Sequence, residues 1–263
     1  MRAWAFSDAV TPEGTRLGWV GLGNAVDTDF SFGIDHGRFA AMSLRVDSRK
    51  ASGAALKLQL AEAVQEELAQ GGNVSNKRKK ELREAILAKL ISKAEWTPAL
   101  TDCLWDLEKG RLLVAASPKA ALPLLERFTS TFGVDAQPYT PNEDLPSFFA
   151  RLSRENVSVN GRELSCAGSA TLATPLHVEG KMAVAVQNNE NTIASALDEG
   201  LIIRKLAMIA DASLEFSLDT SLTVSGLKLP KAEKGADADT DFLLKADVCV
   251  MVADLALAIA GLA

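Results

Sequence analysis

The sequence predicts an α+β fold with mixed α/β character: small antiparallel sheets, a projecting helical hairpin and a C-terminal helix. Three observations favour it. They are glycine-punctuated β-rich runs near the N-terminus, two successive segments with apolar residues at helical spacing, and an apolar run at the C-terminus. A chain of 263 residues with 48% hydrophobic content can bury one large core or two modest ones, which excludes disorder as its main state.

The first sheet is predicted from two segments, residues 16–20 and 39–46, which are rich in β-forming residues and separated by several glycines. Further along, residues 100–107 and 111–116 flank a Lys109-Gly110 turn and predict a two-stranded hairpin. A helix is expected to follow, because Ser117 is a good N-cap, Pro118 suits the first helical position and Gly133 suits the C-terminal end of a helix.

The helical hairpin is predicted from residues 54–94. Apolar residues recur every four positions in its first half. Gly71-Gly72 then ends the first helix, and a second apolar stripe follows. These stripes consist of Leu56, Leu60, Val64 and Leu68, and then of Leu82, Ile86 and Leu90. Two such helices pack as an antiparallel pair, which we expect to project from the body of the protein.

Three prolines in residues 137–146 mark the best boundary between two halves. We therefore expect a first α/β lobe of residues 1–53 and 95–140, the hairpin of residues 54–94, and a second α/β lobe of residues 141–263. The second lobe is predicted to hold helices near 146–153 and 191–197, and strands over 181–187, 201–210, 213–218 and 222–229. Residues 241–263 fit either a strand plus a helix or a single helix.

Several classes of protein are excluded or disfavoured by composition. The N-terminus lacks a signal-peptide pattern, and the C-terminal apolar run is interrupted by Asp254 and Gly261, so we expect a cytoplasmic protein without a membrane anchor. Three widely spaced cysteines predict reduced thiols and no disulfide framework. The two histidines, His36 and His177, have no Cys or His at zinc-ligand spacing, and a catalytic triad would have to use one of them. We expect structural or surface roles for both, and no catalytic residue, metal or cofactor.

The strongest candidate site is the run Lys77, Arg78, Lys79 and Lys80 at the start of the second hairpin helix, with Arg83 one turn later. Residues 76–95 hold seven cations against three glutamates. Cations near a helix N-terminus oppose the helix dipole, so helix stability does not explain them, whereas a phosphate partner does. The alternative is a hairpin tip kept soluble by its charge.

Weaker basic sets include Arg204 with Lys205, and Arg45, Arg49, Lys50 and Lys57, which matter only if the fold gathers them. The net charge of −6 disfavours a simple basic DNA-binding module, but segregated charge still allows a positive inner surface. Asp27 and Asp29 suggest a nuclease's metal ligands, although the residues that two-metal hydrolysis usually recruits are missing nearby.

Several short blocks in succession resemble the RdgC family of recombination-associated DNA-binding proteins. They are Gly18-Trp19-Val20, the basic hairpin followed by Leu104-Trp105-Asp106 and Gly110, residues 197–200 leading into Lys205-Leu206-Ala207, Leu227-Lys228-Leu229, and Ala246-Asp247 before the apolar C-terminal run. The resemblance covers most of the chain and rests on the order of the blocks.

The resemblance implies a homodimer closed into a ring that encircles duplex DNA without sequence preference and limits the access of recombinase filaments. The partners implied are therefore duplex DNA, a second copy, and a recombinase met indirectly through shared DNA, in a nucleoid-associated location. The hairpin would act as a gate, Trp96 as a dimer contact, and Gln187 as one member of a Lys-Gln pair whose lysine is replaced by Val186 here. Relatives also carry an additional strand and helix before the segment matching residues 1–20. A metal-dependent exonuclease is the alternative function.

Overall fold

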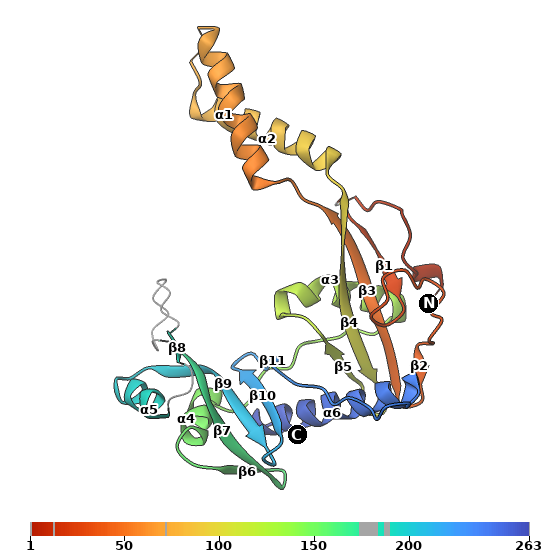
Figure 1. Ribbon diagram of the computed structural model, residues 1–263, viewed down its shortest axis with the longest axis vertical. Coiled ribbons are helices and arrows are strands. Elements are labelled where there is room, and N and C mark those ends of the chain that lie inside the picture. Colours follow the sequence, from red (N-terminus) through yellow and green to blue (C-terminus); the bar gives the residue numbers. More distant parts are fainter. Residues whose placement is uncertain (1, 13, 72, 174–183, 187–189, 263) are drawn as a thin grey trace. The chain divides into compact units, whose positions relative to one another are not determined.

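The structure is a computed structural model that describes residues 2–12, 14–71, 73–173, 184–186 and 190–262 (Figure 1). The described helices are the 3₁₀ helix η1 Arg2–Trp4, and α1 Gly53–Ala69, α2 Asn76–Lys93, α3 Pro118–Phe132, α4 Leu145–Leu152, α5 Glu190–Asp198 and α6 Ala238–Ile259. The described strands are β1 Arg16–Val20, β2 Asp35–His36, β3 Phe39–Arg49, β4 Trp96–Asp106, β5 Arg111–Val114, β6 Val157–Val159, β7 Arg162–Ala173, β8 Val184–Val186, β9 Ile202–Ala210, β10 Leu214–Asp219 and β11 Val224–Ser225. The predicted α+β class is confirmed.

The chain forms two compact units. The first contains Met1–Asp35, Ala40–Cys103 and Glu126–Gly133, and the second contains His36–Phe39, Leu104–Leu125 and Val134–Ala263. Phe39, for example, packs with Ala246 and Val250 of α6, which explains why segments from the first half belong to the second unit. The division into lobes of 1–53 with 95–140 and of 141–263 stays a prediction.

The first sheet has the strand order β1-β3-β4-β5, with β2 paired to β3. Strands β1 and β3 are antiparallel, and the register places buried Trp19 opposite buried Leu44. The indole Nε1 of Trp19 donates to Thr131 Oγ1 at 2.9 Å, so the ring is both packed and hydrogen-bonded. The sheet predicted near the N-terminus is confirmed, although β3 continues past Val46 to Arg49.

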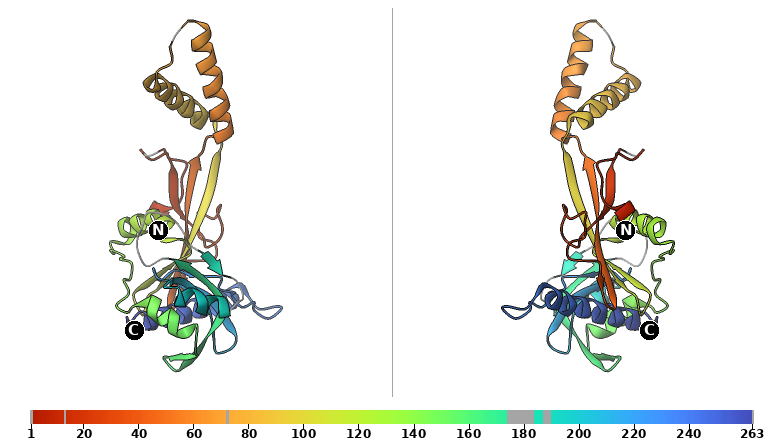
Figure 2. Two further views of the ribbon diagram at one scale, coloured as in Figure 1. Left: turned by 90° about the vertical axis from the view of Figure 1, so that its left-hand side faces the viewer. Right: turned by 90° about the vertical axis from the view of Figure 1, so that its right-hand side faces the viewer.

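The helical hairpin is confirmed, with bounds within one residue of those predicted. Ser52 and Ser75 cap its two helices, accepting from the backbone N–H groups of Ala55 and Arg78 at 3.4 and 3.2 Å. Figures 1 and 2 show α1 leaving the end of β3 and α2 leading into β4. Among the described residues of α1 and α2 none is buried, so the helices stabilise each other through a half-buried seam alone.

The second sheet has the order β11-β10-β9-β7-β6, with β8 paired to β7, and every pair is antiparallel. Its core joins side chains from α4, the central strands and α6, including Phe149, Phe216 and Leu255. Strands β6 and β7 were not predicted, because residues 162–173 are largely small and polar and show no clear alternation.

Two predictions for the second half need correction. The strand expected over 222–229 is reduced to Val224–Ser225, because Leu222 and Gly226 adopt positive φ angles of 60° and 70° that turn the chain. The strand expected over 181–187 falls mostly outside the described residues, and its described part is β8. The C-terminal alternatives resolve to the single helix α6.

Candidate nucleic-acid interface

The basic run of the hairpin occupies the first turns of α2, where Lys77, Arg78, Lys79 and Lys80 are all exposed. The first turn contains no acidic residue, so the positive end of the helix dipole meets only positive side chains there. The Ser75 cap satisfies one backbone N–H but supplies no charge. This end of α2 is therefore electropositive.

Arg78 differs from its three lysine neighbours because it is committed to carboxylates within the hairpin. Its Nη2 lies 2.6 Å from Glu67 Oε1 on α1, and its Nη1 lies 3.3 Å from Glu81 Oε2. The hydrogen bond with Glu67 is the main reason that the pKa of the Arg78 guanidinium is raised. Arg78 therefore ties α2 to α1 and is not available to a ligand without breaking that contact.

Lys77, Lys79 and Arg83 form no ion pair within the described part of the chain, and all three are exposed. Lys79 and Arg83 are four residues apart and thus share one face of α2. Lys80 makes only a long contact, 4.0 Å from Glu84. The hairpin consequently presents several cations that no carboxylate neutralises.

The predicted pair Arg204 and Lys205 lies on β9, where the register against β7 shifts between Thr171 and Leu172. Because of this irregularity Ile203 and Leu206 both reach the same core, although they are three residues apart. The two cations between them are left half-exposed and pair with no carboxylate in the described chain. Gln187 lies outside the described residues.

Trp96, predicted as a dimer contact, is half-buried at the start of β4. The guanidinium carbons of Arg16 and Arg49 each lie 4.3 Å from the centroid of its ring. Sequence reasoning missed Arg16 and grouped Arg49 only with its neighbours in the chain. The residues come from three different strands, and no spacing in the sequence signals their meeting.

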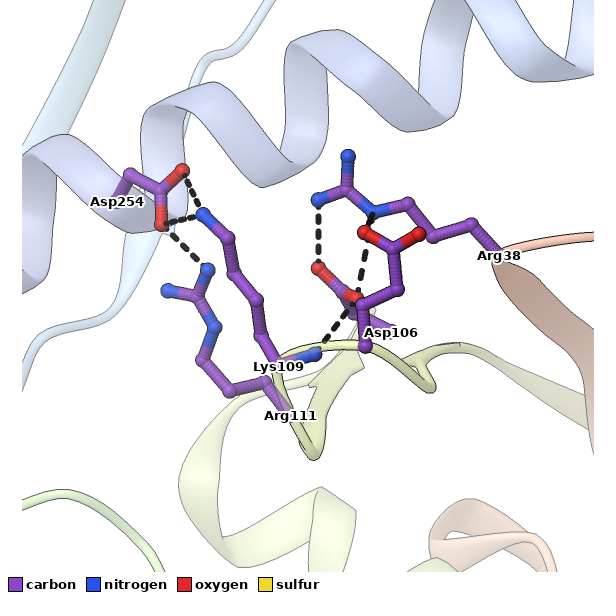
Figure 3. A network of polar contacts seen from close by, with 6 residues as sticks. Arg38, Asp106, Lys109, Arg111 and Asp254 are labelled. Atoms are coloured by element: carbon purple, nitrogen blue, oxygen red, sulfur yellow. Dashed lines mark hydrogen bonds and ion pairs between the residues drawn. The ribbon is translucent and has the colours of Figure 1, made fainter.

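A second group of charges, shown in Figure 3, belongs to the second unit and is balanced internally. Arg38 donates to both oxygens of buried Asp106 and lies 3.3 Å from Glu108 Oε2, and Lys109 and Arg111 both pair with Asp254 on α6. Burial opposes ionisation of Asp106 and Asp254, but hydrogen bonds from these cations outweigh it and lower the pKa of both carboxyls. This network stabilises the fold and leaves little free charge for an anionic ligand.

The described residues show no group of three His, Cys, Asp or Glu side chains placed to hold a metal ion. The carboxylate of Asp27 accepts from the backbone N–H and the hydroxyl of Ser31, at 2.8 and 3.0 Å, and the backbone hydrogen bond chiefly lowers its pKa. His36 Nδ1 lies 2.8 Å from Asp239 Oδ1. Within the described chain, no helix has the length and apolar character needed to span a bilayer.

The fold and the site together define an α+β protein whose unpaired cations gather on a helical hairpin and on the second sheet. A family model described as "Putative exonuclease, RdgC" matches residues 1–263. The chain therefore belongs to the RdgC family of recombination-associated DNA-binding proteins, which confirms the resemblance seen in its sequence. No curated protein matches the chain.

Proposed function

We propose that this protein binds duplex DNA through its sugar-phosphate backbone, without sequence preference, and limits the access of recombinase filaments by occupying the DNA. The observation that carries the proposal is the set of unneutralised, exposed cations on α2, namely Lys77, Lys79 and Arg83. Lysine and arginine side chains that contact phosphates supply affinity but carry no sequence information. Family membership supports DNA as the ligand.

The acidic net charge is compatible with this function because the charge is segregated. Asp237, Asp239 and Asp241 cluster at the start of α6, where carboxylates favour the helix dipole. Asp237 caps the helix by accepting from the Thr240 N–H at 2.7 Å. These three carboxylates thus have a structural use within the second unit, whereas the surplus charge of residues 76–95 is positive.

We further propose that the protein acts as a homodimer closed into a ring, with the hairpin at one contact between the copies. Three apolar side chains of the hairpin are left exposed, Leu58 at 62%, Leu68 at 53% and Ile91 at 37%. Apolar groups that the hairpin cannot bury within itself support a contact with a second copy. Sedimentation with and without a short duplex tests this, and a monomer in both conditions overturns it.

The binding proposal is tested by replacing Lys77, Lys79 and Arg83 together with Glu and titrating labelled duplex by fluorescence anisotropy at several salt concentrations. For a backbone contact, log affinity falls against log salt with a slope of roughly −0.9 per neutralised phosphate. The variant should bind more weakly and with a shallower slope. Unchanged affinity and slope would remove the hairpin from the interface.

A charge-matched control comes from three exposed lysines of the second unit that form no ion pair among the described residues: Lys119, Lys231 and Lys234. Replacing all of them with Glu changes the net charge as much as the hairpin variant does. Duplex affinity should respond far less to this control. An equal loss would show that binding depends on net charge and not on the hairpin.

The description of the family raises exonuclease activity as the alternative, and we propose binding without cleavage. End-labelled duplex incubated with the protein and Mg²⁺ or Mn²⁺ should keep its length. Asp27→Asn and Asp29→Asn are the first variants to compare if products appear. Shortened products that vanish with one of these changes would establish a nuclease instead.

A further inference from the structure

Arg16, Arg49 and Trp96, here called the root cluster, lie where the hairpin joins the first sheet. Arg16 begins β1, Arg49 ends β3 and Trp96 begins β4. The register pairs Arg16 with Asp47, which is two residues from Arg49, so both arginines project from the same face of the sheet. Both guanidinium carbons lie 4.3 Å from the centroid of the indole ring.

The root cluster has more hydrogen-bond donors than acceptors. Arg16 Nε, Arg49 Nε and Trp96 Nε1 are all buried and have no hydrogen-bond partner among the described residues. Arg49 uses Nη1 only for a 3.3 Å bond to the carbonyl oxygen of Ser92 and pairs with no carboxylate in the described chain. Buried donors without acceptors are costly, so their gathering in one cluster indicates an acceptor-rich ligand.

The surroundings of the root cluster favour an anion. Lys50 directly follows Arg49 and is exposed, and Lys93 is exposed at the end of α2. Arg16 pairs with Asp8 at 2.7 Å, but Asp8 is 84% exposed and its carboxylate can exchange with another anion. A phosphate would supply the oxygen acceptors that the donors of the root cluster lack.

Arg45 shows how an arginine is arranged when its role is structural. It also stacks on an aromatic ring, with its guanidinium carbon 3.9 Å from the centroid of Phe6. However, Nε and Nη2 each donate to buried Asp47 at 2.7 Å, and Nη1 donates to the carbonyl oxygen of Ala25 at 2.9 Å. Every nitrogen of Arg45 is used within the protein, in contrast to the arginines of the root cluster.

We propose that the root cluster is a phosphate-binding site that holds the DNA backbone at the base of the hairpin, a proposal that rests on the proposed function. The position of each guanidinium carbon over the indole ring restrains the arginine side chain, which pre-organises its donors for the oxygens of a phosphate. The indole N–H of Trp96 adds a further donor. This site adds contacts that are separate from Lys77, Lys79 and Arg83 on α2.

The deciding variant is Trp96→Phe, which keeps an aromatic face for both arginines but removes the N–H donor. We expect it to weaken duplex binding several-fold, while the melting temperature of the free protein stays unchanged or rises because a buried unpartnered donor is lost. Arg49→Gln should weaken binding further and make the salt slope shallower by roughly 0.9. Lys234→Gln is the control that changes charge equally in an exposed loop.

A purely structural cluster gives the opposite pattern: both variants lower the melting temperature but bind duplex like the wild type, which overturns the proposal. Melting temperatures measured in inorganic phosphate and in chloride, at equal ionic strength, show whether the site binds free phosphate or requires the DNA backbone. Phosphate could raise the melting temperature of the wild type but not that of Arg49→Gln, while both proteins bind duplex equally well. In that case the site binds free phosphate and the assignment to DNA is wrong.

The two proposals fail in distinguishable ways. If the α2 triple variant loses duplex binding while both root-cluster variants retain it, the proposed function stands and the root cluster is excluded. If the wild type binds no duplex, the proposed function falls, and the DNA assignment of the root cluster falls with it. A melting temperature of the wild type that does not respond to phosphate then excludes a phosphate site altogether.

Discussion

Arg78 on α2 donates two hydrogen bonds to a single oxygen of Glu67 on α1, from Nε at 2.9 Å and from Nη2 at 2.6 Å. The contact joins the two helices near their connecting turn, in a hairpin that has no buried residue among those described. Within the basic run, this residue thus stabilises the structure, while its neighbours Lys77 and Lys79 form no ion pair among the described residues.

We therefore predict that Arg78→Gln and Lys79→Gln have different effects. Arg78→Gln should loosen the hairpin, seen as faster backbone hydrogen exchange over residues 53–93, because α1 and α2 lose their charged link. Lys79→Gln should leave exchange unchanged and make the salt dependence of duplex binding shallower. Identical behaviour of the two variants in both measurements would contradict the division of roles.

The network of Asp106 and Asp254 predicts a loss of stability in acid. Their pKa values are lowered in the folded protein, so they stabilise it fully above the unfolded pKa of about 3.9 and progressively less as pH falls through the folded values. Chemical unfolding from pH 6 down to about pH 2 should show a falling free energy of unfolding below about pH 4.

Asp106→Asn should flatten that acid dependence, because the substituted residue no longer takes up a proton. At neutral pH the same variant should lose about 1–3 kcal/mol, since Asp106 is 1% exposed and its partner Arg38 would keep an incomplete set of acceptors. Asp8→Asn, at a side chain 84% exposed, is the control and should leave the acid transition in place. If Asp106→Asn does not alter the acid transition, the loss of stability in acid is caused by other groups.

The hairpin was predictable because its signals are local. Apolar residues every four positions and the Gly71-Gly72 pair that ends the first helix are both read along the chain. The C-terminal helix could not be separated from a strand plus a helix, since α6 is apolar on most sides and periodicity then carries little information. Strand β7 was missed for a related reason, because small residues dominate it.

The candidate sites depend on long-range contacts. For these sites the sequence identified the residues but did not show which of them are paired or which meet in the fold. It picked Arg78 and Lys79 as equivalent, although only Arg78 finds a carboxylate on the other helix. It picked Trp96 through a family resemblance but could not place Arg16 beside it, because β1 and β4 are eighty positions apart and meet through β3. Strand register decides such meetings, and register is set by tertiary packing.

The three cysteines should differ in reactivity towards a thiol reagent. Burial is the main cause that raises the pKa of the Cys103 thiol to about 12, so this residue holds almost no thiolate at pH 8. Cys166 and Cys249 are half-buried, and both should react before Cys103 in the native protein. Mass mapping after a short exposure at pH 8 should find Cys103 unmodified until denaturant is added, and early labelling of Cys103 would contradict its burial.

Gly18 provides a test of how the N-terminal segment is held on the first sheet. A Cβ at this position would lie 2.3 Å from the Cα of Phe6, a backbone atom that cannot move aside alone. The Phe6 N–H donates to the carbonyl oxygen of Trp19 at 2.9 Å, so Gly18→Ala should break this contact and cost about 1–3 kcal/mol in urea unfolding. Gly53→Ala is the matched control, because a Cβ there meets nothing within 4 Å and α1 should be unchanged or slightly more stable. Equal stability of both variants would mean that the N-terminal segment does not pack on β1 in solution.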